Sequence, residues 1–305
     1  MNKVDKIWMN GSFVKWDDAK IHVLTHALHY GGAVFEGIRC YNTVKGPAVF
    51  RLNDHMKRMY NSAKIYLMKI PYRIEELCMV IKELIKINRL NECYIRPIAY
   101  YGYGQMGLDP RKCPVDVAIA VWPWGAYLGE EGLRKGIRCK ISSWCRIDSR
   151  ILPPQAKASA NYLNSILAKL EAVNNGYDEA IVPNINGEIA EGSGENLFIV
   201  KDEVLITPPL SSGILPGITR DSVIKIAKDM NIPVIERSIS REEIFTADEA
   251  FFTGTAAEVT PIREVDGRVI GEGRRGPVTE RIQSKFFEIV KGRDERYSLW
   301  LDPVQ

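Results

Sequence analysis

The sequence has no apolar run as long as the ~18 residues of a membrane-spanning helix, and its first six residues lead into no apolar signal core. Cysteine is also scarce. The six cysteines, at positions 40, 78, 93, 113, 139 and 145, include no Cys-x-x-Cys pair, so neither a zinc site nor a redox motif is indicated. We therefore expect a cytoplasmic protein with reduced, mostly structural thiols.

A large excess of one charge is missing as well. The 41 Lys and Arg residues and the 38 Asp and Glu residues leave a formal net charge of +3, which is too balanced for a dedicated nucleic-acid binder. No internal repeat or low-complexity tract is present. The 305 residues can bury a large core, and about two domains or one large α/β unit are expected at this length. Composition therefore favours a small-molecule site over a nucleic-acid or membrane partner.

Apolar residues alternate between strand and helix spacing, which indicates a mixed α/β fold. A turn-rich stretch after residue 122 is interpreted as an interdomain connection. This predicts a small N-terminal α/β domain over 1–122, a loop over 123–133 and a large C-terminal domain over 134–305. Helices are predicted over residues 53–66, 73–90, 162–174, 221–230 and 277–290, and strands over 94–101, 115–122, 180–183, 188–190, 196–200 and 204–207. The apolar helix faces are Leu163, Ile166, Leu167 and Leu170 in one helix, and the inward-pointing Ile282, Phe286 and Ile289 in another.

The most informative segment surrounds Lys157, in Ala156-Lys157-Ala158-Ser159-Ala160-Asn161-Tyr162. A lysine carries chemistry only when its amine is neutral or bound to a carbonyl, and small neighbours let a bulky planar partner approach the backbone. Pyridoxal 5'-phosphate is such a partner, because it needs a lysine for its Schiff base, a carboxylate opposite its ring nitrogen and a phosphate cradle. Glu191 offers the carboxylate, with Glu195 as its nearest rival, and Leu215-Pro216-Gly217-Ile218-Thr219-Arg220-Asp221 offers the cradle. Each piece alone is equally typical of a solvated surface, but their order favours the cofactor.

In these segments the sequence resembles the branched-chain aminotransferases, members of the class IV pyridoxal-phosphate transaminases. The resemblance covers almost the whole chain and includes Trp8-Met9-Asn10-Gly11, His26-Ala27-Leu28-His29-Tyr30-Gly31, Phe35-Glu36-Gly37-Ile38-Arg39-Cys40-Tyr41 and Trp300-Leu301-Asp302. It implies a two-domain α/β (α+β) chain of pyridoxal-phosphate fold type IV, with the cofactor in the interdomain cleft of the large C-terminal domain. It also implies a ping-pong transaminase that moves the amino group between L-leucine, L-isoleucine or L-valine and 2-oxoglutarate, in branched-chain amino acid biosynthesis or degradation. The implied assembly is a homo-oligomer, at least a dimer and often a trimer of dimers.

The resemblance also implies the cofactor ligands. Lys157 would be the covalent anchor and the general acid and base. Glu191 would pair with the ring nitrogen, and Tyr162 would bind the phenolic oxygen. Backbone amides at the start of the predicted 221–230 helix suit a phosphate dianion. The remaining cofactor ligands would be Arg58, Leu215, Gly217, Ile218, Thr219, Gly254 and Thr255.

An enzyme of this type accepts an aliphatic side chain and the γ-carboxylate of glutamate in one pocket. Phe35, Trp124 and Tyr127 would form an apolar wall for the first, although core packing is the alternative for such aromatics. Arg96 with Tyr30 would hold the second, since an arginine in an apolar strand needs a buried anion or an exit to solvent. The other substrate residues implied are Gly37, Arg39, Tyr94, Ala256, Ala257 and Leu108, with Tyr30 and Leu108 reaching in from a neighbouring subunit. No metal is expected.

Alternative functions remain at this stage. D-amino-acid aminotransferases and aminodeoxychorismate lyases share the lysine and the glutamate, so only the substrate residues separate them from this chain. A non-catalytic pyridoxal-phosphate-binding protein should lack the substrate arginine and the aromatic pocket.

Two further motifs point to other classes of protein. Gly102-Tyr103-Gly104-Gln105-Met106-Gly107 fits the G-x-G-x-x-G pattern of a dehydrogenase, but prolines at positions 110 and 114 deny the helix that should bind the pyrophosphate. His22, His26 and His29 have the spacing of a metal-binding helix face, but Gly31-Gly32 breaks the stretch. Both motifs leave the Lys157 segment unexplained.

Overall fold

The computed structural model describes residues 3–125 and 129–304, which form two compact units. The first unit contains residues 1–124, 156–160 and 289–305, and the second contains residues 125–155 and 161–288. Two segments expected in the C-terminal domain, residues 156–160 and 289–305, thus lie in the first unit. A bridge joins Ala158 to Val34, and the last strand pairs with the strand that ends at Phe50. These pairings link residues far apart in the sequence, so local patterns do not reveal them.

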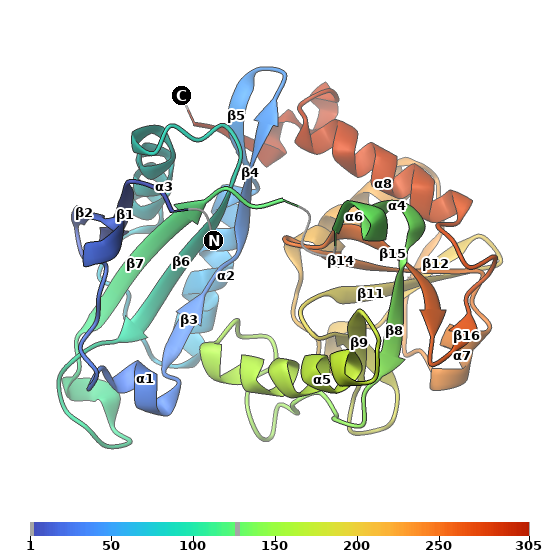
Figure 1. Ribbon diagram of the computed structural model, residues 1–305, viewed down its shortest axis with the longest axis horizontal. Helices are drawn as coiled ribbons and strands as arrows, with labels where there is room; N and C mark the ends of the chain where they lie inside the picture. Colours follow the sequence, from blue (N-terminus) through green and yellow to red (C-terminus); the bar gives the residue numbers. More distant parts are fainter. Residues whose placement is uncertain (1–2, 126–128, 305) are drawn as a thin grey trace. The chain divides into compact units, whose positions relative to one another are not determined.

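The first unit is built on an antiparallel sheet with the order β17-β5-β4-β6-β7-β1-β2, and β3 pairs with β6 (Figure 1). Two longer helices cover one face of this sheet. The strands are β1 (Lys6–Met9), β2 (Ser12–Lys15), β3 (Ala33–Phe35), β4 (Ile38–Thr43), β5 (Gly46–Phe50), β6 (Cys93–Tyr101), β7 (Val115–Trp122) and β17 (Leu301–Pro303). The α-helices are α1 (His26–Tyr30), α2 (Leu52–Ile65) and α3 (Ile74–Ile87).

The alternation of side chains along β6 gives the sheet two different faces. Ile95 and Ala99 are fully buried against α2 and α3 in the core of the first unit. Arg96, Ile98 and Tyr100 point to the opposite face, because successive strand residues alternate. The face that carries Arg96 is therefore the one that the helices leave open.

The second unit holds a mixed sheet with the order β10-β9-β8-β15-β14-β11-β12-β13, and β16 pairs with β15. The pairs β8 with β9, β8 with β15, and β12 with β13 are parallel. The strands are β8 (Ile137–Ile141), β9 (Glu179–Pro183), β10 (Ile189–Gly192), β11 (Asn196–Lys201), β12 (Val204–Thr207), β13 (Val234–Glu236), β14 (Glu249–Gly254), β15 (Glu258–Val265) and β16 (Arg268–Val269). The α-helices are α4 (Gly129–Lys135), α5 (Tyr162–Asn174), α6 (Ile218–Asp229), α7 (Arg241–Phe245) and α8 (Pro277–Val290).

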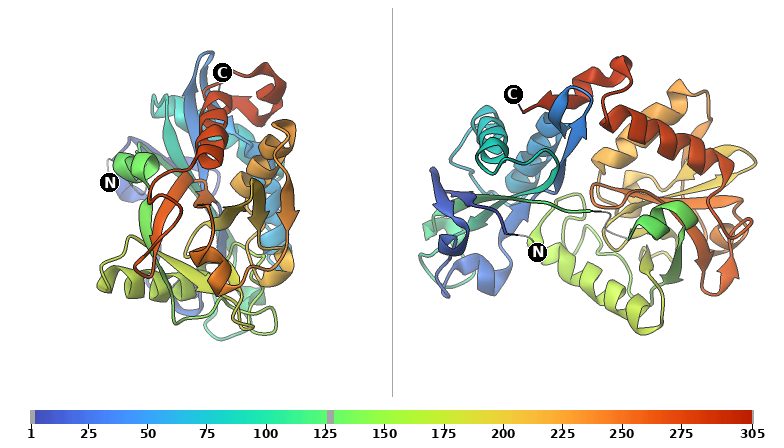
Figure 2. Two further views of the ribbon diagram at one scale, coloured as in Figure 1. Left: turned by 90° about the vertical axis from the view of Figure 1, so that its right-hand side faces the viewer. Right: turned by 45° about the horizontal axis from the view of Figure 1, so that its top comes forward.

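Helix α5, yellow-green in Figure 2, packs by a different face from the one its leucines suggest. Its buried residues are Ser165, Ala168 and Ala172, and the two alanines contact Ala180 and Val182 of β9. Small side chains let the helix lie close to the strand, so the larger residues turn outward. Leu163, Ile166, Leu167 and Leu170 share one face, as predicted, but they are 66%, 51%, 43% and 53% exposed.

Most predicted elements have close counterparts. The helices over 162–174 and 277–290 and the strand over 115–122 have the predicted bounds. Ile282, Phe286 and Ile289 are buried, as predicted. Helix α6 begins at Ile218 rather than at residue 221, because Gly217 has extended backbone angles and serves as its N-cap. Among the described residues, no helix is both long enough and apolar enough to cross a membrane.

Candidate active site

The backbone of Lys157 is held on both sides within the first unit. Its N–H donates to Ser62 Oγ at 3.0 Å, and its carbonyl accepts from Phe35 N–H at 3.0 Å. Ser62 Oγ in turn donates to the carbonyl of Arg58, one turn earlier on α2, at 2.9 Å. Helix α2 and strand β3 therefore fix the peptide groups on either side of the Lys157 side chain.

The amine of Lys157 and the guanidinium of Arg96 lie beside the same aromatic ring. Lys157 Nζ is 5.2 Å, and Arg96 Cζ 4.9 Å, from the centroid of the Phe35 ring. Arg96 Nη2 donates to the Tyr94 hydroxyl at 3.3 Å. Arg96 Nε is buried, and no hydrogen-bond partner for it exists among the described residues. A buried donor left unpaired is costly, so this position favours an anionic ligand.

An aromatic group surrounds the Tyr94 hydroxyl. The Tyr94 ring lies 4.5 Å from that of Trp124 and 5.2 Å from that of Trp122 between centroids. Gly37 approaches Tyr94 so closely that a Cβ there would overlap the hydroxyl, which explains the glycine. Arg39 is buried and donates from Nη2 to the carbonyl of Trp124 at 3.1 Å. Gly37 and Arg39 thus shape and support the aromatic wall.

Arg58 is paired with a buried carboxylate that we did not single out from the sequence. Glu36 is fully buried and accepts from Arg58 Nε at 2.7 Å and from Arg58 Nη2 at 2.8 Å. His55 Nδ1 lies 2.8 Å from Glu36 Oε2. Burial by itself would raise the pKa of Glu36, but Arg58 and His55 outweigh it and hold the pKa well below its usual range. Glu36 is therefore an ionised partner of Arg58 at neutral pH.

In the second unit, Glu191 is a buried carboxylate held from three directions. Its Oε1 is 2.7 Å from Nε of Arg146, in a largely desolvated ion pair. Its Oε2 accepts from Asn196 Nδ2 and from Leu215 N–H, both at 3.0 Å. These contacts fix the orientation of a negative charge that the pairing with Arg146 keeps ionised.

The predicted phosphate cradle is the N-terminus of α6. Gly217 stands directly before the helix, and a Cβ there would overlap Oδ1 of Asn196. Ile218 and Thr219 form the first turn, whose N–H groups have no partner within the helix itself. Thr219 is buried. The arrangement suits an anion through both the amides and the helix dipole.

The segment between β14 and β15 carries the remaining predicted ligands of the second unit. Gly254, Thr255 and Ala256 are half-buried, while Ala257 is buried and accepts from Thr260 Oγ1 at 2.6 Å through its carbonyl. Thr253, which the sequence did not suggest, pairs across the sheet with Asn196. Its Oγ1 is buried, and no partner for it exists in residues 3–125 and 129–304.

The other predicted residues lie apart or outside the description. Tyr162 is half-buried at the first position of α5. Tyr30 is 43% exposed at the end of α1, and Leu108 is 87% exposed. No described contact brings Tyr30 or Leu108 to Lys157 or Arg96 of the same chain. Tyr127 lies outside the described residues.

Sequence reasoning missed several supporting side chains. Glu36 was within a quoted segment, and its place between Phe35 and Gly37 was the available signal. Asn196 follows Glu195 directly and was equally open to notice. Arg146 and His55 had no local signal, because only the fold brings them to Glu191 and Glu36.

The two rival motifs have structural explanations of their own. The glycines at 102 and 104 allow close packing, since a Cβ would overlap Asp116 at the first and crowd the Cys113 backbone at the second. A single short 3-10 helix, Pro110–Lys112, follows in place of an α-helix. Ring nitrogens of His26 and His29 lie 2.7 and 2.8 Å from backbone carbonyls. In the described part of the chain, no group of three or more His, Cys, Asp or Glu residues could hold a metal ion.

Comparison with known proteins agrees with this geometry. A family model described as "Amino-transferase class IV" matches residues 33–265. The chain is 53% identical over 303 residues to the branched-chain-amino-acid aminotransferase of Salmonella typhimurium, covering 99% of this chain and 98% of that relative. The chain belongs to the class IV aminotransferase family. The resemblance seen in the sequence is therefore confirmed.

Solved structures of class IV aminotransferases share the fold of this one. The crystal structure of Escherichia coli branched-chain amino acid aminotransferase gives a TM-score of 0.98 at 52% identity, with 99% of this chain and 100% of that chain covered. A second branched-chain amino acid aminotransferase, from T.th. and complexed with N-(5'-phosphopyridoxyl)-L-glutamate, gives 0.96 at 50% identity, with 100% of both chains covered. The predicted mixed fold of this family is confirmed.

Class IV aminotransferases use pyridoxal 5'-phosphate, and the chemistry of the residues fits this cofactor. A buried carboxylate at Glu191 matches a protonated ring nitrogen, and the amides at the start of α6 match a phosphate. The unpaired buried donors Arg96 Nε and Thr253 Oγ1 match the anionic groups of cofactor and substrate. Lys157 supplies the primary amine.

Three buried carboxyl groups lie close together in the sequence of the second unit, at residues 179, 191 and 195. Glu179 is compensated by Lys169 Nζ at 2.7 Å and accepts from Ser193 Oγ at 2.6 Å. Glu195 accepts from Gly194 N–H at 3.1 Å. Burial, with the nearby charges of Glu179 and Glu191, raises the pKa of Glu195 to about 8. Glu195 is thus a neutral acid at pH 7, unlike Glu191.

This difference predicts a pH-dependent effect of Glu195→Gln. The folded protein holds a proton on Glu195 that the unfolded chain releases near pH 4.5, so wild-type stability falls as pH rises from about 4.5 to about 8. The amide carries no such penalty. Denaturant unfolding at several pH values should show the stability of Glu195→Gln relative to wild type increasing over this window and levelling off above it. Glu203→Gln, in the exposed turn after β11, is the control, and a parallel pH trend in both variants would refute the assignment.

Proposed function

We propose that the protein is a branched-chain-amino-acid aminotransferase, which moves the amino group between L-leucine, L-isoleucine or L-valine and 2-oxoglutarate in a ping-pong cycle. The observation that carries this proposal is the buried, unpaired Nε of Arg96 beside an aromatic wall and the Lys157 amine. An aliphatic substrate needs only the wall, whereas glutamate brings a second carboxylate that needs a cation. The relatives of this chain named as branched-chain enzymes, and the glutamate adduct of one of them, support both halves.

The residues described above have distinct proposed roles toward the cofactor. Lys157 Nζ is the covalent anchor, and Glu191 keeps the ring nitrogen protonated. Tyr162 binds the phenolic oxygen. The phosphate ligands are Arg58, Leu215, Gly217, Ile218, Thr219, Gly254 and Thr255. When bound, pyridoxal phosphate accepts the amino group and withdraws electrons from the substrate Cα.

The side chains of the chain itself then divide the work of transfer. Lys157 Nζ takes the proton from the substrate Cα, because its backbone is anchored by Ser62 and Phe35 and its amine has little freedom to wander. The Tyr94 hydroxyl and the amides of Ala256 and Ala257 bind the α-carboxylate. The aromatic wall excludes water from the reacting atoms. Arg39 keeps Trp124 in that wall.

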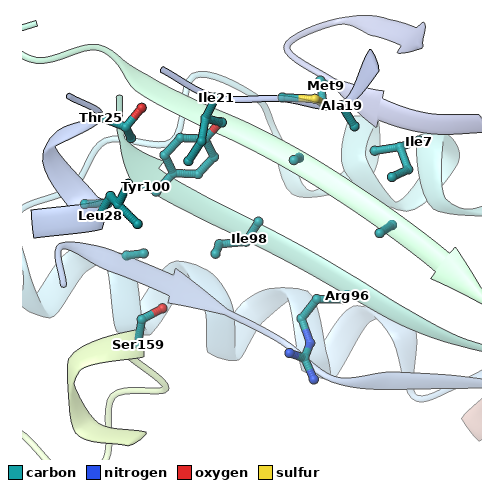
Figure 3. A pocket seen from close by; sticks show the side chains of 14 residues that line it. Ile7, Met9, Ala19, Ile21, Thr25, Leu28, Arg96, Ile98, Tyr100 and Ser159 are labelled. Atoms are coloured by element: carbon teal, nitrogen blue, oxygen red, sulfur yellow. The ribbon is translucent and has the colours of Figure 1, made fainter. Parts of the chain in front are cut away.

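We also propose a homo-oligomer, at least a dimer, in which Tyr30 and Leu108 serve the site of a neighbouring subunit. Both are large exposed side chains. The open sheet face of the first unit also carries an apolar cavity of about 420 Å³. In Figure 3, Arg96 lies at one end of this cavity, with Ile98 and Tyr100 further along β6 and Leu28 of α1 beside them. A cytoplasmic location is proposed as well, on the cysteine usage described above.

The test of the proposed function is a visible spectrum of the purified holoprotein before and after substrate addition. L-Leucine, L-valine and L-glutamate should each abolish the absorption band of the lysine-bound cofactor, whereas D-alanine should leave it unchanged. Borohydride reduction and peptide mapping should place the pyridoxyl group on Lys157. A response to D-alanine would instead indicate a D-amino-acid enzyme, and an adduct on another lysine would sink the assignment of the anchor.

The two neighbouring carboxyl groups should respond oppositely to amide substitution. Glu191→Gln should keep the cofactor bound but slow the half-reaction by several orders of magnitude, because a neutral amide does not hold the ring proton. Glu195→Gln should stay near wild type, since it replaces one neutral group by another. Stopped-flow half-reactions with L-leucine measure both. Near-normal rates in Glu191→Gln would move the role to Glu195.

Arg96→Gln should separate the two substrates of the cycle. Glutamate loses the partner of its γ-carboxylate, whereas leucine loses only packing, so the glutamate half-reaction should be weakened selectively by about 2–5 kcal/mol. Single-turnover rates with L-glutamate and L-leucine give this difference. Arg39→Gln is the matched control and should show no such selectivity. Equal losses for both substrates in Arg96→Gln would assign Arg96 to the α-carboxylate or to structural support.

A further inference from the structure

Glu36 is the fully buried carboxylate of the first unit that none of the roles above uses. It lies between Phe35, whose N–H binds the Lys157 carbonyl, and Gly37, which faces Tyr94. Its own N–H donates to the carbonyl of Pro97 at 2.9 Å. The backbone of Glu36 is therefore fixed in the sheet, and its side chain is directed to α2.

The side chain of Glu36 grips Arg58 through two parallel contacts. Arg58 Nε and Nη2 lie 2.7 and 2.8 Å from the two carboxylate oxygens. This bidentate arrangement fixes both the position and the plane of the guanidinium, which a single contact would not. Glu36 Oε2 also lies 2.8 Å from His55 Nδ1 and 3.3 Å from Gly37 N. The side chains of Glu36, His55 and Arg58 are all buried, so bulk solvent does not weaken the arrangement.

His55 does not compete for the charge of Glu36. Burial, reinforced by the positive charges of Arg58 and Lys157, lowers the pKa of His55 even though Glu36 opposes the shift. A neutral imidazole donates one hydrogen bond to Glu36 and leaves the full negative charge to Arg58. The pair is thus one ionised acid and one guanidinium, oriented by a neutral third partner.

A buried ion pair is weak evidence for stability, because desolvation consumes most of the attraction. A pair that orients a ligand group has a different reason to be retained. We propose that Glu36 is a positioning residue, which holds the Arg58 guanidinium in the orientation that receives the phosphate of the cofactor. This inference rests on the proposed function, because it assigns Arg58 to that phosphate.

The test compares two ligands that differ only by the phosphate. Apoprotein is titrated with pyridoxal 5'-phosphate and with pyridoxal, and both dissociation constants are measured for wild type and Glu36→Gln. The variant should bind pyridoxal 5'-phosphate at least about tenfold more weakly and pyridoxal almost unchanged. Glu36→Asp, which keeps the charge but is one methylene shorter, should show the same selective loss.

The controls separate positioning from other effects. Glu249→Gln alters a buried carboxylate of the second unit that accepts from Val278 N–H and Thr279 N–H, and it should change neither constant. Equal weakening of both ligands in the Glu36 variants would mean that Glu36 acts on Lys157 or on the fold. Tighter phosphate binding in Glu36→Gln would mean that Glu36 only tempers the charge of Arg58. Either outcome overturns the inference, as does failure of both Glu36 variants to fold, judged by circular dichroism.

The proposed function fails in a different way. A wild-type protein that prefers pyridoxal 5'-phosphate to pyridoxal but transfers no amino group from L-leucine would refute the proposed reaction and leave the role of Glu36 intact. A wild-type protein without that preference would refute the role of Glu36, because Arg58 would then have no phosphate to bind.

Discussion

The two hydrogen bonds that hold the Lys157 peptide are the constraint on which the chemistry depends. Ser62 on α2 and Phe35 on β3 fix the backbone on either side of the amine. The same two elements carry Arg58 and the Phe35–Gly37 segment, so one local framework positions the amine, the aromatic ring and the guanidinium together. A lysine on a free loop would lack this registration, and effective catalysis depends on placing reacting groups closely.

Charge compensation is the second organising principle. The fully buried Glu36 is matched by Arg58 and the buried Glu191 by Arg146, so each ionised acid has an arginine within 2.7 Å. Glu195 lacks such a partner and is neutral at pH 7 instead. Two acids only four residues apart thus have opposite protonation states. Their environments, and not their residue type, make one an electrostatic partner and the other a packing group.

The sequence predicted the elements well where the pattern of side chains agreed with packing. Helix α8 presents Ile282 and Phe286 inward, as its spacing predicts. Helix α5 departs from the pattern, because it packs through Ala168 and Ala172 and leaves its leucines exposed. Periodicity identifies which residues share a face, but it does not say which face is buried. When a small face fits the sheet more closely, the apolar stripe turns outward.

The sequence by itself determined the family and the cofactor and singled out Lys157, Glu191 and Arg96, because each depends on residue type and order within short segments. Only the tertiary structure decided that residues 156–160 lie with the N-terminal sheet, that Arg146 faces Glu191, and that Glu36 grips Arg58. It also decided that the Nε of Arg96 is buried without a partner among the described residues. These features join residues tens of positions apart through strand pairing and buried charges, and no local pattern encodes them.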